Sequence, residues 1–272
     1  MSGRDTKAAD EVIARHSARV SRVFELYCQR LIAKRFTAFR ILGEAPSGIL
    51  RERGMVVFSN HSSWYDPLIF FVTSRAMFPS HTAFGPMDAD ALKKYAFMQK
   101  IGIFGVEQES VRGAARFLQV SRGLLAKPGN GIWMTPQGEF ADVRTRPVRF
   151  QGGLARLARD SGAIAIPMAI ELVFWNEARP ELLIHFGDPI DTSTVSRDVD
   201  EWNRHLEQAL TTVQDELAEA ARSRDPDRFT TFIDGTTGVN YIYDGWRYVK
   251  AMLRGERFSA AHGTARRSRN RD

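Results

Sequence analysis

The chain alternates between short apolar runs and longer segments in which apolar residues recur at helical spacing. Apolar runs of strand length lie at 55–59, 82–84, 132–134 and 163–170. Helical periodicity is found after the first run as far as residue 74, and over 88–99, 110–126 and 153–161. Residues 182–186 predict an edge strand. Strands alternating with helices predict an α/β fold, in which a mostly parallel sheet is flanked by helices.

The N-terminal region predicts one long basic helix, from about Asp10 to Ile41, after a loose terminus over residues 1–9. Arginines flank an apolar face that is made up of Val20, Val23, Phe24, Tyr27 and Leu31. A basic amphipathic helix of this kind lies at a membrane interface or packs on its own domain. Periodicity alone does not distinguish the two, because lipid and protein core are both apolar.

The C-terminal third predicts a further helix and then an appendage. Asp198 and Glu201 form a capping box at the start of that helix, and its apolar face carries Trp202, Leu206, Leu210, Val213 and Leu217. The expected organisation is an N-terminal helical segment over 1–42, a central α/β domain over 43–225, an aromatic helical appendage over 226–262 and a disordered basic tail over 263–272.

Composition and charge narrow the function classes. A single cysteine, Cys28, excludes an internal disulfide framework and predicts an intracellular protein. The polar start predicts no secretion signal, and no apolar run reaches the roughly 20 residues that cross a bilayer. The net charge of +6 and the pI of about 9.7 favour anionic lipid or a phosphorylated substrate. No nucleic-acid-binding motif is present, so a nucleic-acid partner is not expected.

His61 and Asp66 are the candidate chemical groups, because they follow the first apolar run at the place where α/β enzymes carry their chemistry. A neutral imidazole takes a proton from a hydroxyl that attacks an acyl carbon. A carboxylate on the other ring nitrogen fixes the tautomer and stabilises the imidazolium that forms. Such a pair also arises by chance where a histidine and an aspartate cap a helix, so spacing alone leaves both readings open.

The wider string is more specific. Asn60-His61-x-Ser63-x-x-Asp66 resembles the first signature block of the glycerolipid acyltransferases, of the lysophosphatidic-acid acyltransferase type. Residues 102–108 resemble the second block, Thr-Pro-Gln-Gly-Glu at 135–139 resembles the third, and 166–169, a proline within a buried strand, resemble the fourth. The resemblance covers roughly residues 40 to 190.

The resemblance implies transfer of a fatty acyl group from acyl-CoA or acyl carrier protein to a hydroxyl of a lysophospholipid or related lipid. His61 would be the general base and Asp66 the residue that orients it, with no covalent acyl-enzyme. The expected substrate-binding residues are Asn60, Ser63, Gln137, Gly138, Glu139, Arg112, Arg144 and Arg146. No cofactor is expected beyond the acyl thioester co-substrate, and the expected location is peripheral, on the cytoplasmic face of a membrane.

The chain departs from the family pattern where that pattern helps to bind the acceptor's phosphate. Gln108 stands in place of an arginine, Gln137 of a glutamate, Glu139 of a threonine and Phe140 of a common arginine. These changes put a glycerol-3-phosphate-type acceptor in doubt and favour a neutral or sugar hydroxyl. Arginines just downstream of both blocks keep phosphate open, since a guanidinium fork suits phosphate oxygens.

Two other functions remain open. The altered third block motivates a lipid-binding or tethering protein on the same fold, with weak or no catalysis. The same base acting on water would make a thioester or ester hydrolase, although the Gly-x-Ser-x-Gly elbow of serine hydrolases is missing. The six histidines show no metal-ligand spacing, so no metal site is predicted.

Overall fold

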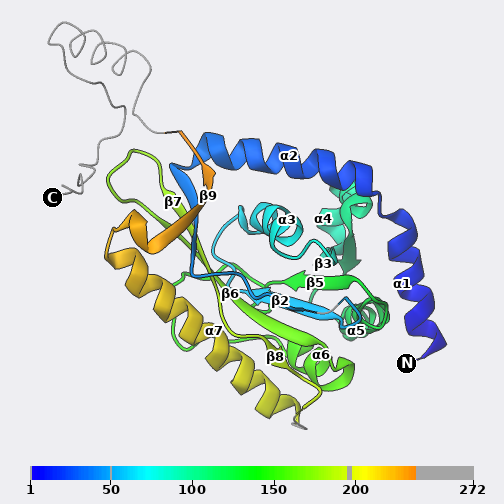
Figure 1. Ribbon diagram of the computed structural model, residues 1–272. Helices are drawn as coiled ribbons and strands as arrows, with labels where there is room; N and C mark the ends of the chain where they lie inside the picture. Colours follow the sequence, from blue (N-terminus) through cyan, green and yellow to red (C-terminus); the bar gives the residue numbers. More distant parts are fainter. Residues whose placement is uncertain (1, 50, 195–197, 237–272) are drawn as a thin grey trace, which may run out of the picture.

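The computed structural model describes residues 2–49, 51–194 and 198–236, and in these residues helices cover both faces of a mixed β-sheet (Figure 1). The strands are β1 (Ala38–Leu42), β2 (Met55–Ser59), β3 (Thr82–Asp88), β4 (Ile103–Val106), β5 (Asn130–Met134), β6 (Ile164–Val173), β7 (Glu181–Phe186), β8 (Ile190–Asp191) and β9 (Phe229–Asp234). Their order is β4-β3-β5-β2-β6-β7-β1-β9, and β8 pairs with β6. The run from β4 to β6 is parallel throughout, as is the β7–β1 pair. The predicted mostly parallel α/β fold is confirmed.

The helices divide between the two faces. They are α1 (Gly3–Arg15), α2 (Ala18–Arg35), α3 (Asp66–Met77), α4 (Ala89–Lys94), α5 (Val111–Leu125), α6 (Gly153–Ser161) and α7 (Val199–Arg222), with short 3₁₀ turns at Ala96–Ile101 and Pro226–Arg228. Apolar residues of α2 and α3 form one core cluster with the sheet, and those of α1, α5, α6 and α7 form another.

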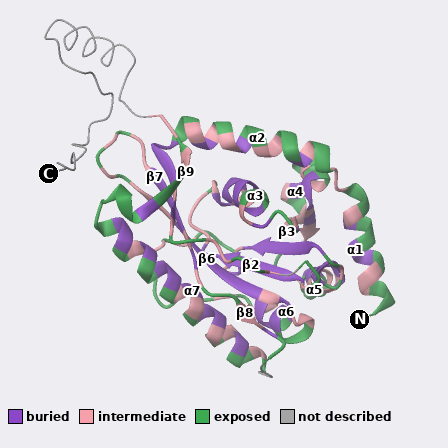
Figure 2. Cartoon of the chain, viewed as in Figure 1, coloured by how far each residue is buried: buried purple, intermediate pink, exposed green. Residues whose placement is uncertain are grey.

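Both core clusters meet on β2, as they do on its neighbours β5 and β6. Met55 and Val57 belong to the α2–α3 cluster, and Val56 and Phe58 belong to the cluster on the opposite face. All five residues of β2 are buried, and Figure 2 shows this strand in purple. A strand covered on both faces reads as an unbroken apolar run rather than an alternating one. The chain leaves β2 into the His61 turn.

Two predicted helix starts are confirmed by their capping contacts. The Ser110 hydroxyl accepts from the Gly113 N–H at 2.8 Å at the start of α5. At α7 the capping box of Asp198 and Glu201 has both of its bonds, at 2.8 and 3.0 Å. The predicted apolar face of α7 is buried in the core.

The N-terminal prediction of one helix over 10–41 is wrong in its bounds. Ser2 begins α1 through a capping box with Asp5, so residues 3–9 are helical rather than loose. Ser17 caps a second helix, and α2 ends at Arg35. The residues after it form β1, whose partners are β7 and β9. Pairing with strands that lie about 140 and 190 residues away in the sequence stabilises β1 as a strand. The helical periodicity of neighbouring residues carries no information on such distant partners.

The C-terminal predictions are also corrected. Leu182–Phe186 lies in β7, which is not an edge strand, because β6 and β1 pair with it on either side. Among the described residues the edge strand on this side of the sheet is β9, which lies within the segment predicted to be a helical appendage and runs antiparallel to β1. The aromatic stretch and basic tail predicted over 237–272 lie outside the described residues.

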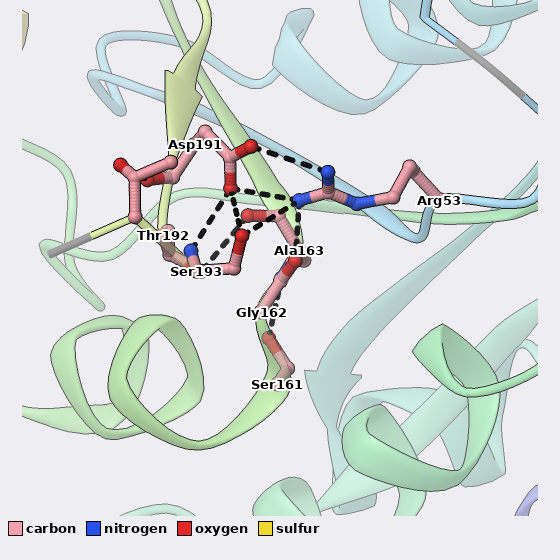
Figure 3. A network of polar contacts seen from close by, with 8 residues as sticks. Arg53, Ser161, Gly162, Ala163, Asp191, Thr192 and Ser193 are labelled. Carbon is pink, nitrogen blue, oxygen red and sulfur yellow. Dashed lines mark hydrogen bonds and ion pairs between the residues drawn. The ribbon is translucent and has the colours of Figure 1, made fainter. Parts of the chain in front are cut away.

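A polar network ties together the starts of the central strands (Figure 3). Arg53, just before β2, donates to both carboxylate oxygens of Asp191 at 3.1 and 2.7 Å, and to the Gly162 carbonyl at 2.8 Å. The Arg53 guanidinium and Ser193 hold the pKa of the Asp191 carboxyl well below its ordinary value. Because β2 begins at this end and the His61 turn follows its other end, the network supports the fold and not the chemistry.

Candidate active site

The turn between β2 and α3 is anchored to the neighbouring strand β6. The Asn60 side chain donates to the Ile170 carbonyl at 2.9 Å and accepts from the Ile170 N–H at 2.8 Å. The predicted role of Asn60 in binding substrate is therefore corrected: it is buried, and both polar atoms of its amide are taken up by the backbone. Asn60 fixes the position from which His61 projects.

His61 and Asp66 form the predicted pair. Nδ1 of His61 lies 2.8 Å from Oδ2 of Asp66. Asp66 is fully buried, whereas the His61 side chain is one-fifth exposed. Since an ionised carboxylate only accepts, Nδ1 carries the proton of a neutral imidazole and Nε2 keeps its lone pair. His61 thus holds the tautomer that a general base needs.

Asp66 accepts four hydrogen bonds. Besides His61, the backbone N–H groups of Ser62 and Ser63 donate to it at 2.9 and 3.1 Å, and the Ser63 hydroxyl donates at 2.8 Å. Asp66 also opens α3, where the helix dipole favours a negative charge. The predicted substrate contact of Ser63 is corrected, because its hydroxyl is used to hold Asp66 and to accept from the Tyr65 N–H.

The third block lies against the backbone of His61. β5 is parallel to β2, so both strands end at the same edge of the sheet. Oε1 of Gln137 accepts from the His61 N–H at 2.9 Å, and the Ala141 N–H donates to the His61 carbonyl at 2.8 Å. Residues 137–141 therefore clamp His61 from both sides of its peptide unit. Gln137 thus holds the base through Oε1, and its contact with substrate stays a prediction.

Gly138 allows this clamp to close. Its φ of +78° lies in the left-handed region, and a Cβ at this position would come 2.3 Å from the Gln151 side chain. The backbone conformation of Gly138 therefore explains why a glycine stands at this position. Glu139, the next residue, is exposed to solvent.

Phe140 covers one face of the imidazole. The two ring centroids lie 4.2 Å apart, with 33° between the ring planes. Phe140 is also 61% exposed, so its other face is open to solvent. Sequence reasoning noted Phe140 only as a departure from the family pattern, and the contact with His61 depends on the turn at Gly138.

The arginines expected at the site lie on α5 and on the loop that follows residues 137–141. Arg112 follows β4, three strands from β2, which is about 14 Å at about 4.8 Å per strand. Arg144 forms an ion pair with Asp142, and Arg146 forms one with Asp215 of α7.

Arg144 and Arg146 do come together in a cleft beside the site. It has a volume of about 220 Å³ and is lined also by Glu171 of β6 and by Gln214 and Arg222 of α7. Sequence reasoning missed the α7 residues, because only the packing of α7 on β6 brings them to the loop. In the described ranges no helix is long and apolar enough to span a membrane.

The comparisons with known proteins bear on this geometry. Residues 40–171 match the model of the family described as Acyltransferase. The chain belongs to this acyltransferase family. The match begins in β1 and ends in β6, so it contains the His61 turn and the clamp. The resemblance predicted from the signature blocks is thereby confirmed at the level of the family.

A solved structure of another protein has a similar fold. It is the 1-acyl-sn-glycerophosphate (LPA) acyltransferase PlsC from Thermotoga maritima, with a TM-score of 0.54 and 15% identity over 73% of this chain and 79% of that chain. No curated protein matches the chain. Family and fold together make this protein an acyltransferase with the PlsC-like α/β architecture.

Proposed function

We propose that this acyltransferase moves a fatty acyl group from the thioester of acyl-CoA or acyl carrier protein to a hydroxyl of a lysophospholipid or related lipid. His61 acts as the general base and Asp66 orients it. The observation that carries the proposal is the 2.8 Å contact between His61 Nδ1 and a buried Asp66 that accepts three further hydrogen bonds.

The proton path follows from the tautomer. Nε2 takes the proton of the acceptor hydroxyl while that oxygen attacks the thioester carbonyl carbon. The tetrahedral intermediate then collapses, the carbon–sulfur bond breaks, and the imidazolium returns the proton to the departing sulfur. The products are an ester and a free thiol, and Asp66 stabilises the imidazolium between the two steps.

A turnover assay separates this proposal from its alternatives. Purified protein receives acyl-CoA or acyl carrier protein thioester with and without lysophospholipid, and thiol, ester and free fatty acid are measured. The proposal predicts an ester and a thiol in equal amounts, only when acceptor is present. Free fatty acid without acceptor would indicate a hydrolase, and lipid binding without turnover would indicate a tethering protein.

We further propose that α2 attaches the protein peripherally to the cytoplasmic face of a membrane. Its inward side packs into the core through Cys28 and Ile32. Its outward side leaves Val23 69% and Tyr27 53% exposed. Arginines lie beside them on the same helix, at positions 19, 22 and 30. An apolar patch bordered by cations suits the anionic lipids of the cytoplasmic leaflet.

Flotation with anionic liposomes tests this attachment. Deletion of residues 1–40 is unsuitable, because it removes part of β1 and the helix that covers one core cluster. Val23→Asp combined with Tyr27→Asp is expected to abolish flotation. Val111→Asp is the matched control, since Val111 is 90% exposed on α5, which packs on the opposite face of the sheet. If both variants float equally well, α2 is not the element that binds the membrane.

A further inference from the structure

The cleft beside the active site is built from three separate parts of the chain. The loop over 143–146 forms one side, the end of β6 from Ala169 to Glu171 forms another, and the C-terminal half of α7 forms the third. Its volume of about 220 Å³ is far above the roughly 10–15 Å³ that admits one water molecule.

The charges around this cleft cancel. Arg144 is held by both carboxylate oxygens of Asp142, and Arg146 by Asp215. The third guanidinium, Arg222, lines the cleft together with the carboxyl of Glu171. Three cations thus stand against three carboxylates. A site for phosphate would need positive charge that is not already compensated, so the cleft does not suit an anion.

The cleft also offers hydrogen-bond acceptors. Gln214 is 6% exposed, and its amide nitrogen donates to the Val143 carbonyl at 3.3 Å. Its Oε1 is buried with no hydrogen-bond partner among the described residues. A buried polar atom without a partner is uncommon and indicates a place for a donor from water or ligand. Glu171 adds a carboxyl whose pKa is raised by burial, against the lowering effect of the neighbouring arginines.

Two short connections join the cleft to His61. Ile170, on its wall, is bonded to the Asn60 side chain, and Asn60 is next to His61 in sequence. Val143 lies two residues beyond Ala141, whose N–H donates to the His61 carbonyl. Two residues of fully extended chain span at most about 7 Å, so Val143 lies within that distance of Ala141 along the backbone. The exposed ring of Phe140 lies on this same strip of chain.

We propose that this cleft binds an uncharged, polyhydroxylated head group, a sugar or another polyol, of the acyl acceptor; this rests on the proposed acyltransferase function. Hydroxyl groups both donate and accept, so they can donate to Gln214 and Glu171 and accept from the arginines. Phe140 offers an apolar surface to the part of the acceptor that lies between the head group and the base.

Binding to the full-length wild type in the absence of acyl donor tests the ligand class without catalysis. Hexyl β-glucoside, hexyl phosphate and 1-hexanol share one alkyl chain and are compared below micellar concentration by ligand-observed NMR. We expect the glucoside to bind at least about tenfold more tightly than the other two, a difference that one or two hydrogen bonds supply. Tighter binding of hexyl phosphate, or equal binding of all three, would overturn the proposal.

Variants locate the binding. Arg222→Ala and Glu171→Ala are each expected to weaken glucoside binding about fivefold or more, because each removes a hydrogen-bonding group of the cleft. Arg204→Ala, an exposed arginine on the same helix but outside the cleft, is expected to leave it unchanged. Unchanged affinity in both cleft variants, with their thermal unfolding like that of the wild type, would place the sugar elsewhere and overturn the proposal.

A turnover assay distinguishes the proposed ligand of the cleft from the proposed acyltransferase activity. Acyl transfer to the glucoside is expected, with KM raised in the Arg222→Ala variant and kcat little changed, because Arg222 binds the head group and does not touch the reacting atoms. Binding in the cleft without acylation of any acceptor would contradict the acyltransferase proposal and leave the ligand class standing. Acylation of a lysophospholipid with no glucoside binding would contradict the proposed ligand class and leave the acyltransferase proposal standing.

Discussion

Replacement of Asp66 by Asn separates the charge of this residue from its geometry. Oδ2 accepts from the His61 ring and from the N–H groups of Ser62 and Ser63, whereas Oδ1 accepts only from the Ser63 hydroxyl. An asparagine can place its carbonyl oxygen at the Oδ2 position, and its NH₂ can then donate to the Ser63 oxygen. The fold of the turn and the histidine tautomer are kept, and the negative charge is lost.

The magnitude follows from Coulomb's law. Two unit charges about 4 Å apart interact by about 4 kcal/mol at an effective dielectric constant of about 20. Asp66 is fully buried and His61 only one-fifth exposed, so solvent screens the pair little. Because the imidazolium charge is partial in the transition state, the loss of kcat should be on the order of 100- to 1,000-fold.

The assay is the release of CoA thiol in the presence of a hydroxyl lipid acceptor, with thermal unfolding followed on the same samples. Asp66→Ala is expected to lose more stability than Asp66→Asn, because it leaves buried N–H donors without an acceptor. Asp90→Asn, an exposed residue on α4, is the matched control and should keep full activity. A kcat for Asp66→Asn above one-tenth of the wild-type value would refute the electrostatic role of this carboxylate.

Three further outcomes are expected. Gly138→Ala should lower kcat more than Gly48→Ala, because both residues have φ near +77° but Gly138 lies between Gln137 and Ala141, which bond to the backbone of His61; equal effects on kcat would contradict the role of this loop in holding the base. The Cys28 thiol, whose pKa is raised by burial to about 12, should not react with a thiol reagent at pH 8 until the protein is unfolded, and mass spectrometry of the labelled protein checks this. The pKa of Asp191 is depressed in the folded state, so its stabilising effect is complete above its ordinary pKa of about 4 and is lost as the pH falls further. The difference in thermal midpoint between wild type and Asp191→Asn should therefore shrink between pH 7 and pH 3, and a constant difference would contradict this.

The elements that the sequence predicted well are those with local signals. The bounds of β2 and α6 agree with the structure, because an apolar run ending in a turn and a nine-residue periodic stretch between glycines are self-contained patterns. The caps at Ser110 and Asp198 act on backbone groups three residues away. Interactions of this range can be read from consecutive residues.

The elements that were missed depend on distant partners. β9 pairs with β1 across most of the chain, and β7 is central only because β1 lies outside it. At the site, the His61–Asp66 contact lies within one turn and was predicted. The Phe140 stack and the Gln137 clamp need β5 beside β2, and the cleft needs α7 against β6. Local spacing carries no information on such contacts.

The same distinction explains the corrections at Asn60 and Ser63. A signature block identifies residues that the turn requires, without stating whether they contact the substrate or hold the base. Here Asn60 bonds to β6 and Ser63 bonds to Asp66, so both act by positioning. The block therefore specifies one reactive side chain and the framework around it.

The most direct test of the account is the turnover of acyl-CoA by the His61→Ala variant with the acceptor that the wild type uses best. Nε2 of His61 is the atom assigned to take the hydroxyl proton, and general bases contribute about 10²- to 10⁴-fold to rate. The account predicts a fall of at least about 100-fold in kcat, with thermal unfolding and liposome binding like those of the wild type. Thiol release and ester formation at more than one-tenth of the wild-type rate would contradict it.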